Sequence, residues 1–397
     1  MNTENAKPQQ RFLPPPPGAE YPLMGSAVGG GSYNSHLVAG VLFIGLAAIG
    51  AIDWWLVAWI DGCLAIGLLL DRRTMNRKIA LRAMPGQMLL YSQVALRAAV
   101  HMFPYYAFAF VLYLGMAPVV LPLNFAISSF VMLYGFYMLL RVYWLVHYLW
   151  VLNFRWEHAG RTFQTHQANL KTRRSAIQHV LWAFFLGNVG LVVRCSSQVI
   201  TIAGFEYLRQ SLNLDLTQHP TLNVHVMSIF WGTVVVWLAT FWFMLQPTFL
   251  IYYRVHRTFH SCRPLYDSVH SIHHRGVLPT QLDSGTISPL EFALTEYNLP
   301  AGMLVPNWYW TLGQIILAFA GHLPSHDTNT WMKTGHHHLL HHRLFNVNFG
   351  LIAREDKRYG SFYCEPPQAA SAPEPSGEAA PPARRRHAVA ALAGEDD

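Results

Sequence analysis

The sequence predicts an all-α fold, a polytopic membrane helix bundle that carries a histidine-rich cap. Its 397 residues are 52% hydrophobic and only 12% charged, whereas soluble proteins carry about 25% charged residues. Long apolar stretches alternate with basic loops, and twelve of the 21 histidines fall between His256 and His342. We therefore expect lipid to cover much of the surface and the histidines to gather at one end of the bundle.

Composition divides the chain into four parts. Residues 1–34 hold a run of prolines and a run of glycines and are expected to form a disordered N-terminal tail. Residues 35–220 should form the N-terminal transmembrane helices, and residues 221–365 a histidine-box catalytic region with the last spans. Residues 366–397, rich in alanine and proline, should form a disordered C-terminal tail.

The first apolar stretch runs from Leu37 to Leu70. At about 1.5 Å per residue it is longer than a bilayer core of roughly 30 Å requires. Asp53 and Asp61 interrupt it, so the sequence fits either one long tilted helix or two short segments.

Four further apolar stretches form two hairpins. Ala98–Val119 pairs with Phe125–Val151, and Ile177–Tyr207 pairs with Val224–Tyr253, whereas Trp308–Ala320 is too short to cross and suits a re-entrant or interfacial helix. Basic loops precede, separate and follow the two hairpins. An even number of spans therefore lies between successive basic loops, so all these loops lie on the same side of the membrane. The positive-inside rule makes that side cytoplasmic. The histidine cluster lies on it too. The basic residues are Arg72, Arg73, Arg77, Lys78 and Arg82; Arg155, Arg161, Lys171, Arg173 and Arg174; and Arg254, Arg257, Arg263 and Arg275.

The histidines form four motifs at helical spacing. Two read His-x-x-x-His and two read His-x-x-His-His, so each motif can present its rings on one helix face toward one metal. Each His-x-x-His-His motif would give a three-nitrogen face. The ten candidate metal ligands are His256, His260, His270, His273, His274, His322, His326, His338, His341 and His342.

Ten imidazoles exceed the four to six ligands of one transition metal and fit two adjacent metals. Imidazole suits iron, zinc, copper and nickel alike, so the ligand type does not name the metal. Oxidative attack on an unactivated C–H bond would need a redox metal and O2, which zinc cannot supply. His336 and His337 are expected to support the ligands or to be exposed, and lone histidines such as His36 and His179 to be surface or capping residues.

Several segments together resemble the fatty acid hydroxylase / sterol desaturase superfamily. Residues 252–260, ending in His260, are similar to its first box, and Pro264 to His274 to its second. Ser288-Pro289-Leu290-Glu291 resembles the His-Pro-x-Glu segment that often follows, with Ser288 in place of histidine. His338 to Gly350 resembles the final box with its Asn-Phe-Gly tail. Residues 321–327, around His322 and His326, depart most from the family pattern. The resemblance covers about Gln246 to Arg358.

This resemblance implies an integral-membrane histidine-box di-iron oxygenase with the ten histidines as ligands. It implies two iron ions, which zinc can replace in preparations, and O2 as co-substrate. It implies a lipid substrate, either sterol or fatty acyl, and leaves hydroxylation and desaturation both open. Electrons would come from a b-type cytochrome, ferredoxin or reductase. Glu291 and Asn348, with His336 and His337, would support the ligands. The membrane would be the bacterial inner membrane or the endoplasmic reticulum.

One alternative class remains open, a non-enzymatic membrane metal-binding protein or transporter. Transporters place their ligands near mid-membrane on the spans themselves, whereas these histidines follow the last clear span. Nucleic-acid binding is not expected, because no basic run with interleaved aromatic residues occurs. The net charge of +7 is instead typical of membrane orientation.

Overall fold

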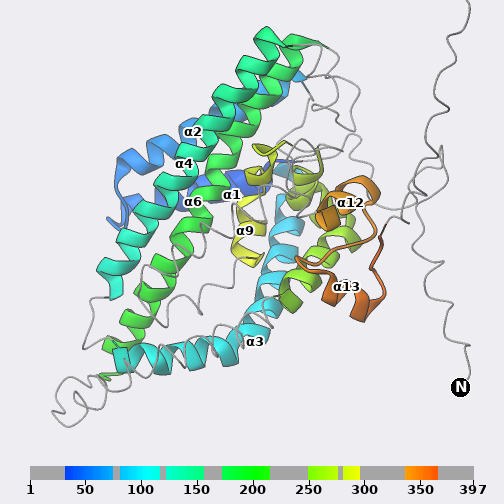
Figure 1. Ribbon diagram of the computed structural model, residues 1–397. Helices are drawn as coiled ribbons and strands as arrows, with labels where there is room; N and C mark the ends of the chain where they lie inside the picture. Colours follow the sequence, from blue (N-terminus) through cyan, green and yellow to red (C-terminus); the bar gives the residue numbers. More distant parts are fainter. Residues whose placement is uncertain are drawn as a thin grey trace, which may run out of the picture. The chain divides into compact units, whose positions relative to one another are not determined.

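The computed structural model describes residues 32–74, 81–116, 122–155, 172–214, 249–275, 280–295 and 336–364. Within these ranges the regular elements are helices and no strand occurs, which confirms the predicted all-α class (Figure 1). Both predicted tails lie almost entirely outside these ranges. So do Trp308–Ala320 and all of the expected Val224–Tyr253 span except its last five residues.

The first apolar stretch is two helices, α1 (Asn34–Ala48) and α2 (Trp54–Thr74). Gly50 ends α1 with a positive φ of 74°, a conformation that glycine adopts without steric cost. The Gly50 N–H donates to the Ala47 carbonyl at 2.9 Å and the Ala51 N–H to the Leu46 carbonyl at 2.8 Å. This pair of bonds is a Schellman motif, which stops the helix. The two-segment alternative is therefore the correct one.

Three long helices follow: α3 (Met84–Met116), α4 (Pro122–Phe154) and α6 (Arg173–Ser211). Pro122 opens α4 at a position where proline costs no hydrogen bond, and Thr172 and Ser175 form a capping box that begins α6. All three extend beyond the apolar stretches that predicted them. Hydropathy detects only the part of a helix that faces lipid or core, and these helices continue into polar sequence.

Four helical segments are long and apolar enough to cross a membrane, namely Trp54–Asp71, Leu81–Val111, Phe130–Phe154 and Arg173–Ser211. The last is 72% buried, against 11% for Phe130–Phe154. The α6 helix therefore lies inside the bundle, with α2 and α4 packed along it (Figure 1). Exposed apolar side chains such as Phe103 and Leu139 make α3 and α4 lipid-facing. The chain is thus a multi-pass membrane protein.

Ser32, Tyr33 and Asn34 were assigned to the disordered tail, but the structure buries them. The Tyr33 hydroxyl donates to Asp71 Oδ2 at 2.6 Å and accepts from Trp182 Nε1 at 3.0 Å. These partners lie far away in the sequence, so local composition gave no sign of them. The tail assignment is wrong at its last three residues.

A buried arginine ties the segment that leads to α9 (Pro289–Thr295) to the membrane helices. Arg141 on α4 donates to the Ala183 carbonyl of α6 at 2.6 Å and to the Leu282 carbonyl at 3.3 Å. Gly187 and Gly285 leave room for the guanidinium, since a Cβ there would lie 2.3 and 2.2 Å from its nitrogens. These hydrogen bonds hold in place the segment that precedes α9, and α9 carries a residue of the site described below.

A buried histidine on α6 adds a second tie to the same segment. His179 Nε2 lies 3.0 Å from Asp283 Oδ1, and both side chains are almost fully buried. Burial alone would raise the pKa of Asp283, but His179 and the Thr280 donors outweigh it and lower the pKa. His179 and the buried His36 are therefore not the surface or capping residues that the sequence led us to expect.

Candidate metal centre

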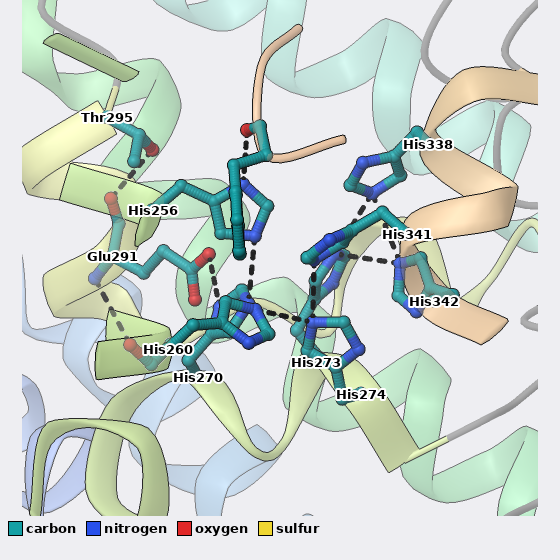
Figure 2. Close-up of polar contacts among 12 residues, drawn as sticks. His256, His260, His270, His273, His274, Glu291, Thr295, His338, His341 and His342 are labelled. Atoms are coloured by element: carbon teal, nitrogen blue, oxygen red, sulfur yellow. Dashed lines mark hydrogen bonds and ion pairs between the residues drawn. The ribbon is translucent and has the colours of Figure 1, made fainter. Parts of the chain in front are cut away.

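Eight of the ten candidate ligands converge in two adjacent groups (Figure 2). Within each group the ligand atoms all lie within 4.8 Å of one another. The larger group, called the five-histidine group, contains His256, His260, His270, His274 and His341. The three-histidine group contains His273, His338 and His342. The remaining two candidates, His322 and His326, lie outside the described residues.

Four helical segments place these rings. The helix over residues 249–261 presents His256 and His260 one turn apart, as the sequence predicted. The second motif follows α8 (Arg263–Leu265). His270 ends a π-helical turn, η4 (Tyr266–His270), and His273 and His274 lie on a 3-10 turn, η5 (His273–Arg275). Single π-helical turns inside helices occur often at functional sites. The last motif lies on α12 (His336–Leu344).

The two His-x-x-His-His motifs do not each serve one metal, contrary to the sequence-based expectation. His270 and His274 join the five-histidine group, whereas His273 joins the three-histidine group. The last motif is divided in the same way, with His341 in one group and His342 in the other. Adjacent helical residues project about 100° apart, so two neighbouring histidines can point toward different groups. Each motif therefore bridges the two groups.

The distances between ring nitrogens match those around a metal ion. His256 Nε2 lies 3.0 Å from His270 Nε2, and His274 Nε2 lies 3.0 Å from His341 Nε2. In the second group, His342 Nε2 lies 3.1 Å from His338 Nε2. Nitrogens about 2.1 Å from a shared metal are roughly 3.0 Å apart at right angles and roughly 3.4 Å apart in a tetrahedron. The donor set therefore fits a metal in each group.

Hydrogen bonds at the outer nitrogens fix which ring nitrogen is free to bind. His256 Nδ1 lies 2.6 Å from the Phe349 carbonyl, and His341 Nδ1 lies 2.7 Å from the Val347 carbonyl. A carbonyl only accepts, so each Nδ1 carries the proton and each neutral ring turns an Nε2 lone pair inward. Lone pairs that face one buried point repel each other unless a cation lies between them, so this arrangement favours a bound metal.

Burial keeps these rings in the form that binds metal. Burial lowers the pKa of His256 to about 4, although the Phe349 carbonyl and Asp356 act in the opposite direction. Burial and then the neighbouring rings hold the pKa values of the other four members well below the ordinary range. Only a neutral imidazole can bind a metal. The five-histidine group is therefore ready to bind at neutral pH.

A buried carboxylate supports His270 from outside the group. Glu291 Oε1 on α9 lies 2.8 Å from His270 Nδ1, and burial raises the pKa of Glu291 well above its ordinary value. A cation on the far side of the ring would favour the ionised carboxylate. Ser288, which replaces the family's histidine, accepts from the Glu291 N–H at 3.1 Å. The serine therefore caps α9 and holds the glutamate in place.

The Asn-Phe-Gly tail forms a tight turn beside the five-histidine group. Asn348 has a positive φ of 56°, which asparagine tolerates better than most residues. Its side chain donates to the His337 carbonyl at 3.1 Å and to the Tyr363 carbonyl at 3.0 Å. At Gly350 a Cβ would lie 2.7 Å from the Ile352 carbonyl oxygen. The turn therefore presents the Phe349 carbonyl to His256.

The carboxylate of Asp356 organises this turn, and sequence reasoning did not find it. Asp356 lies at the middle of α13 (Ala353–Tyr359) and is fully buried. Its carboxylate accepts hydrogen bonds from the N–H groups of Phe349 and Gly350, each at 2.8 Å. It also accepts from Ser361 Oγ at 2.7 Å and lies 3.0 Å from His337 Nε2. In the sequence it sits in the charged run Arg354–Arg358, which is typical of a solvated helix face. The one available signal was its position a few residues after the Asn-Phe-Gly tail.

His337 lies outside both groups and contacts Asp356. The side chain of His336 is not among those that the structure describes. Glu291 contacts His270, and Asn348 contacts the carbonyl of His337.

The fold and the site thus define a multi-pass membrane protein with two adjacent histidine groups that could each hold a metal ion. Residues 239–358 match the fatty acid hydroxylase family, which lies in the sterol desaturase/fatty acid hydroxylase superfamily. The resemblance found in the sequence is therefore confirmed for the histidine-bearing segment, and the first 238 residues lie outside the match. Searches of curated proteins and of solved structures found no match to the chain.

Proposed function

We propose that this chain is a membrane-bound oxygenase that hydroxylates or desaturates a lipid C–H bond with O2 and external electrons. One observation carries the proposal: eight histidines, seven of them buried, form two adjacent groups within a segment that matches the fatty acid hydroxylase family. None of the eight lies on the four candidate membrane spans. That placement favours an oxygenase over a transporter, in which ligands sit on the spans.

The histidines would hold two metal ions, and we propose iron as the working metal. When bound, a redox-active metal pair supplies the activation of O2 that attack on an unactivated C–H bond requires. Hydroxylation consumes the substrate, O2, two electrons and two protons and gives an alcohol and water. Desaturation consumes the same reagents and gives an alkene and two waters.

The chain's own residues hold the ligands and keep water away from them. The Phe349 and Val347 carbonyls and Glu291 fix the rings of His256, His341 and His270. Aromatic rings line the five-histidine group, with Phe345 at 4.8 Å from His274 and Phe349 at 5.2 Å from His260, measured between ring centroids. Such walls exclude water from a reactive site.

The decisive experiment is turnover. Purified, iron-loaded protein with a reductant and O2 would be offered a panel of sterols and fatty acyl lipids, with products identified by mass spectrometry. We expect one lipid class to be oxidised with coupled oxygen consumption. His341→Ala should abolish turnover, whereas His147→Ala, in a histidine on α4 outside both groups, should leave it intact. Absence of any lipid oxidation, together with metal flux into vesicles, would instead identify a metal transporter.

Two further parts of the proposal concern the partner and the orientation. A separate b-type cytochrome, ferredoxin or reductase delivers the electrons, which reconstitution with each donor tests. The histidine groups face the cytoplasm. The exposed Cys364 follows the last histidine motif, whereas Cys63 and Cys195 are buried. An impermeant thiol reagent should therefore label Cys364 only after lysis. If the reagent instead labels intact cells, and Cys364→Ser removes that labelling, the histidine groups face the opposite side of the membrane.

A further inference from the structure

A groove of about 500 Å³ lies between α3 and the helix over residues 249–261. Its floor is apolar, formed by Val94 and Ala98 from α3 and by Ile251 and Val255 from the other helix. These residues belong to a packed cluster that holds the two helices together. The floor can therefore receive a hydrocarbon chain without disturbing polar groups.

Three arginines form the rim of this groove: Arg97, Arg254 and Arg257. All three side chains are exposed, and none of the described residues that line the groove is acidic. Arg257 Nη1 donates to the Tyr253 hydroxyl at 2.9 Å, which orients that guanidinium. Within the described part of the chain, no carboxylate forms an ion pair with any of the three. Among the described residues, the positive charge of the rim is therefore uncompensated.

Two of the rim arginines border apolar stretches of the sequence. Arg97 directly precedes the apolar stretch that begins at Ala98, and Arg254 directly follows the apolar stretch that ends at Tyr253. Beside the groove, α3 exposes Leu96 and Val100 by 65% and 63%. Such apolar exposure on a candidate span is covered by lipid. The groove therefore lies beside a face of α3 that lipid covers.

We propose that this groove binds an anionic phospholipid, with its phosphate at the arginine rim and an acyl chain along the apolar floor. Guanidinium groups match phosphate oxygens in charge and geometry. An anionic lipid keeps a net negative charge that the rim neutralises, whereas a zwitterionic lipid brings a cation that the rim repels. The rim thus selects anionic over zwitterionic head groups.

This site is distinct from the metal centre but shares a helix with it. His256 and His260 lie on one face of the helix over residues 249–261, and Arg254, Thr258 and Ser261 line the groove on the opposite face. Residues on a helix advance by about 100° each, which places the two sets on opposite sides. A lipid held in the groove therefore braces the helix that carries the first histidine motif.

The test uses the full-length protein in detergent, titrated with phosphatidylglycerol or with phosphatidylcholine of the same acyl chains and followed by native mass spectrometry. We expect tighter binding of phosphatidylglycerol and a higher unfolding temperature when it is bound. The double variant Arg97→Gln/Arg254→Gln should weaken phosphatidylglycerol binding roughly 30-fold, because each basic residue near an anionic group contributes a factor of about five.

The matched control is Arg155→Gln, which removes an exposed arginine at the end of α4 that lies over Trp150. It should leave phosphatidylglycerol binding unchanged. If the double variant fails to fold, judged by metal content and unfolding temperature without lipid, the single variant Arg254→Glu replaces it and should abolish the preference for the anionic lipid. Equal binding of both lipids by the wild-type protein, or unchanged binding by a folded variant, would overturn the proposal.

Discussion

Asp356→Asn removes the charge of the carboxylate that organises the turn beside His256, with almost no change in shape. Each Asp356 oxygen accepts from one backbone N–H of the turn, Phe349 on one side and Gly350 on the other, at 2.8 Å in both cases. The asparagine amide can accept on only one side. Its NH2 group must then face a buried N–H donor, so at least one hydrogen bond is lost whichever way the amide turns.

The expected loss follows from that geometry. A buried donor left without its acceptor costs about 1–3 kcal/mol, and the charge-assisted bond that remains is weakened as well, so unfolding should become easier by roughly 2–4 kcal/mol. The turn also presents the Phe349 carbonyl to His256 Nδ1. Loss of such an outer contact typically lowers metal affinity by about 10- to 100-fold.

The assay combines denaturant unfolding with metal content after dialysis against graded chelator. Glu355→Gln is the matched control, because Glu355 is also buried and adjacent but pairs with Arg354 rather than with the turn. The control should keep the metal affinity of the wild-type protein. An Asp356→Asn protein that keeps wild-type metal affinity would refute the idea that Asp356 positions His256.

The remaining predictions concern the ligands, their support and the effect of pH. Glu291→Gln keeps the shape of the residue that contacts His270, so the protein should fold while metal affinity drops about 10- to 100-fold, as equilibrium dialysis would show. His273→Ala should abolish turnover and remove metal from the three-histidine group alone, so elemental analysis should find about half the wild-type metal, and unchanged turnover would exclude His273 from the site. Gly350→Ala brings a Cβ to 2.8 Å from Asp356 Oδ2 and should destabilise the fold by about 1–3 kcal/mol in denaturant unfolding. The pKa of His256 is lowered from 6.5 to about 4, so the unfolded chain takes up protons before the folded chain does. The free energy of unfolding of the metal-free protein should therefore fall as the pH drops from 6.5 toward 4. A free energy of unfolding that stays constant over this range would contradict the burial of neutral rings.

Local pattern was enough to predict the helical class, and eight of the ten histidines that it proposed as ligands lie in the two groups. The spacing of His256 and His260 predicted a shared helix face, and the structure has it. The first apolar stretch left two alternatives, because hydropathy does not show where a helix stops. Gly50 and its left-handed conformation decided between them.

Sequence reasoning failed where a residue's partners are set by the packing of separate segments. No role was predicted for Asp356, which lies in a charged run, yet it is buried and accepts from the N–H groups of Phe349 and Gly350 and from the Ser361 hydroxyl. Tyr33 looked like part of a disordered tail, yet its partners Asp71 and Trp182 come from two membrane helices. From sequence alone a polar residue is expected to be exposed unless its hydrogen-bond partner is known. That partner is decided by how the segments pack.

The sequence by itself determined that the chain crosses a membrane several times, and that histidines at helical spacing gather after the spans. These properties depend on composition and on the helical repeat, which are local. Only the tertiary structure decided that His273 and His274, neighbours in the chain, enter different groups, and that Asp356 holds the turn whose Phe349 carbonyl contacts His256. Those decisions depend on how separate helices pack, because a ring's direction and its outer hydrogen bond are set by contacts that no single segment contains.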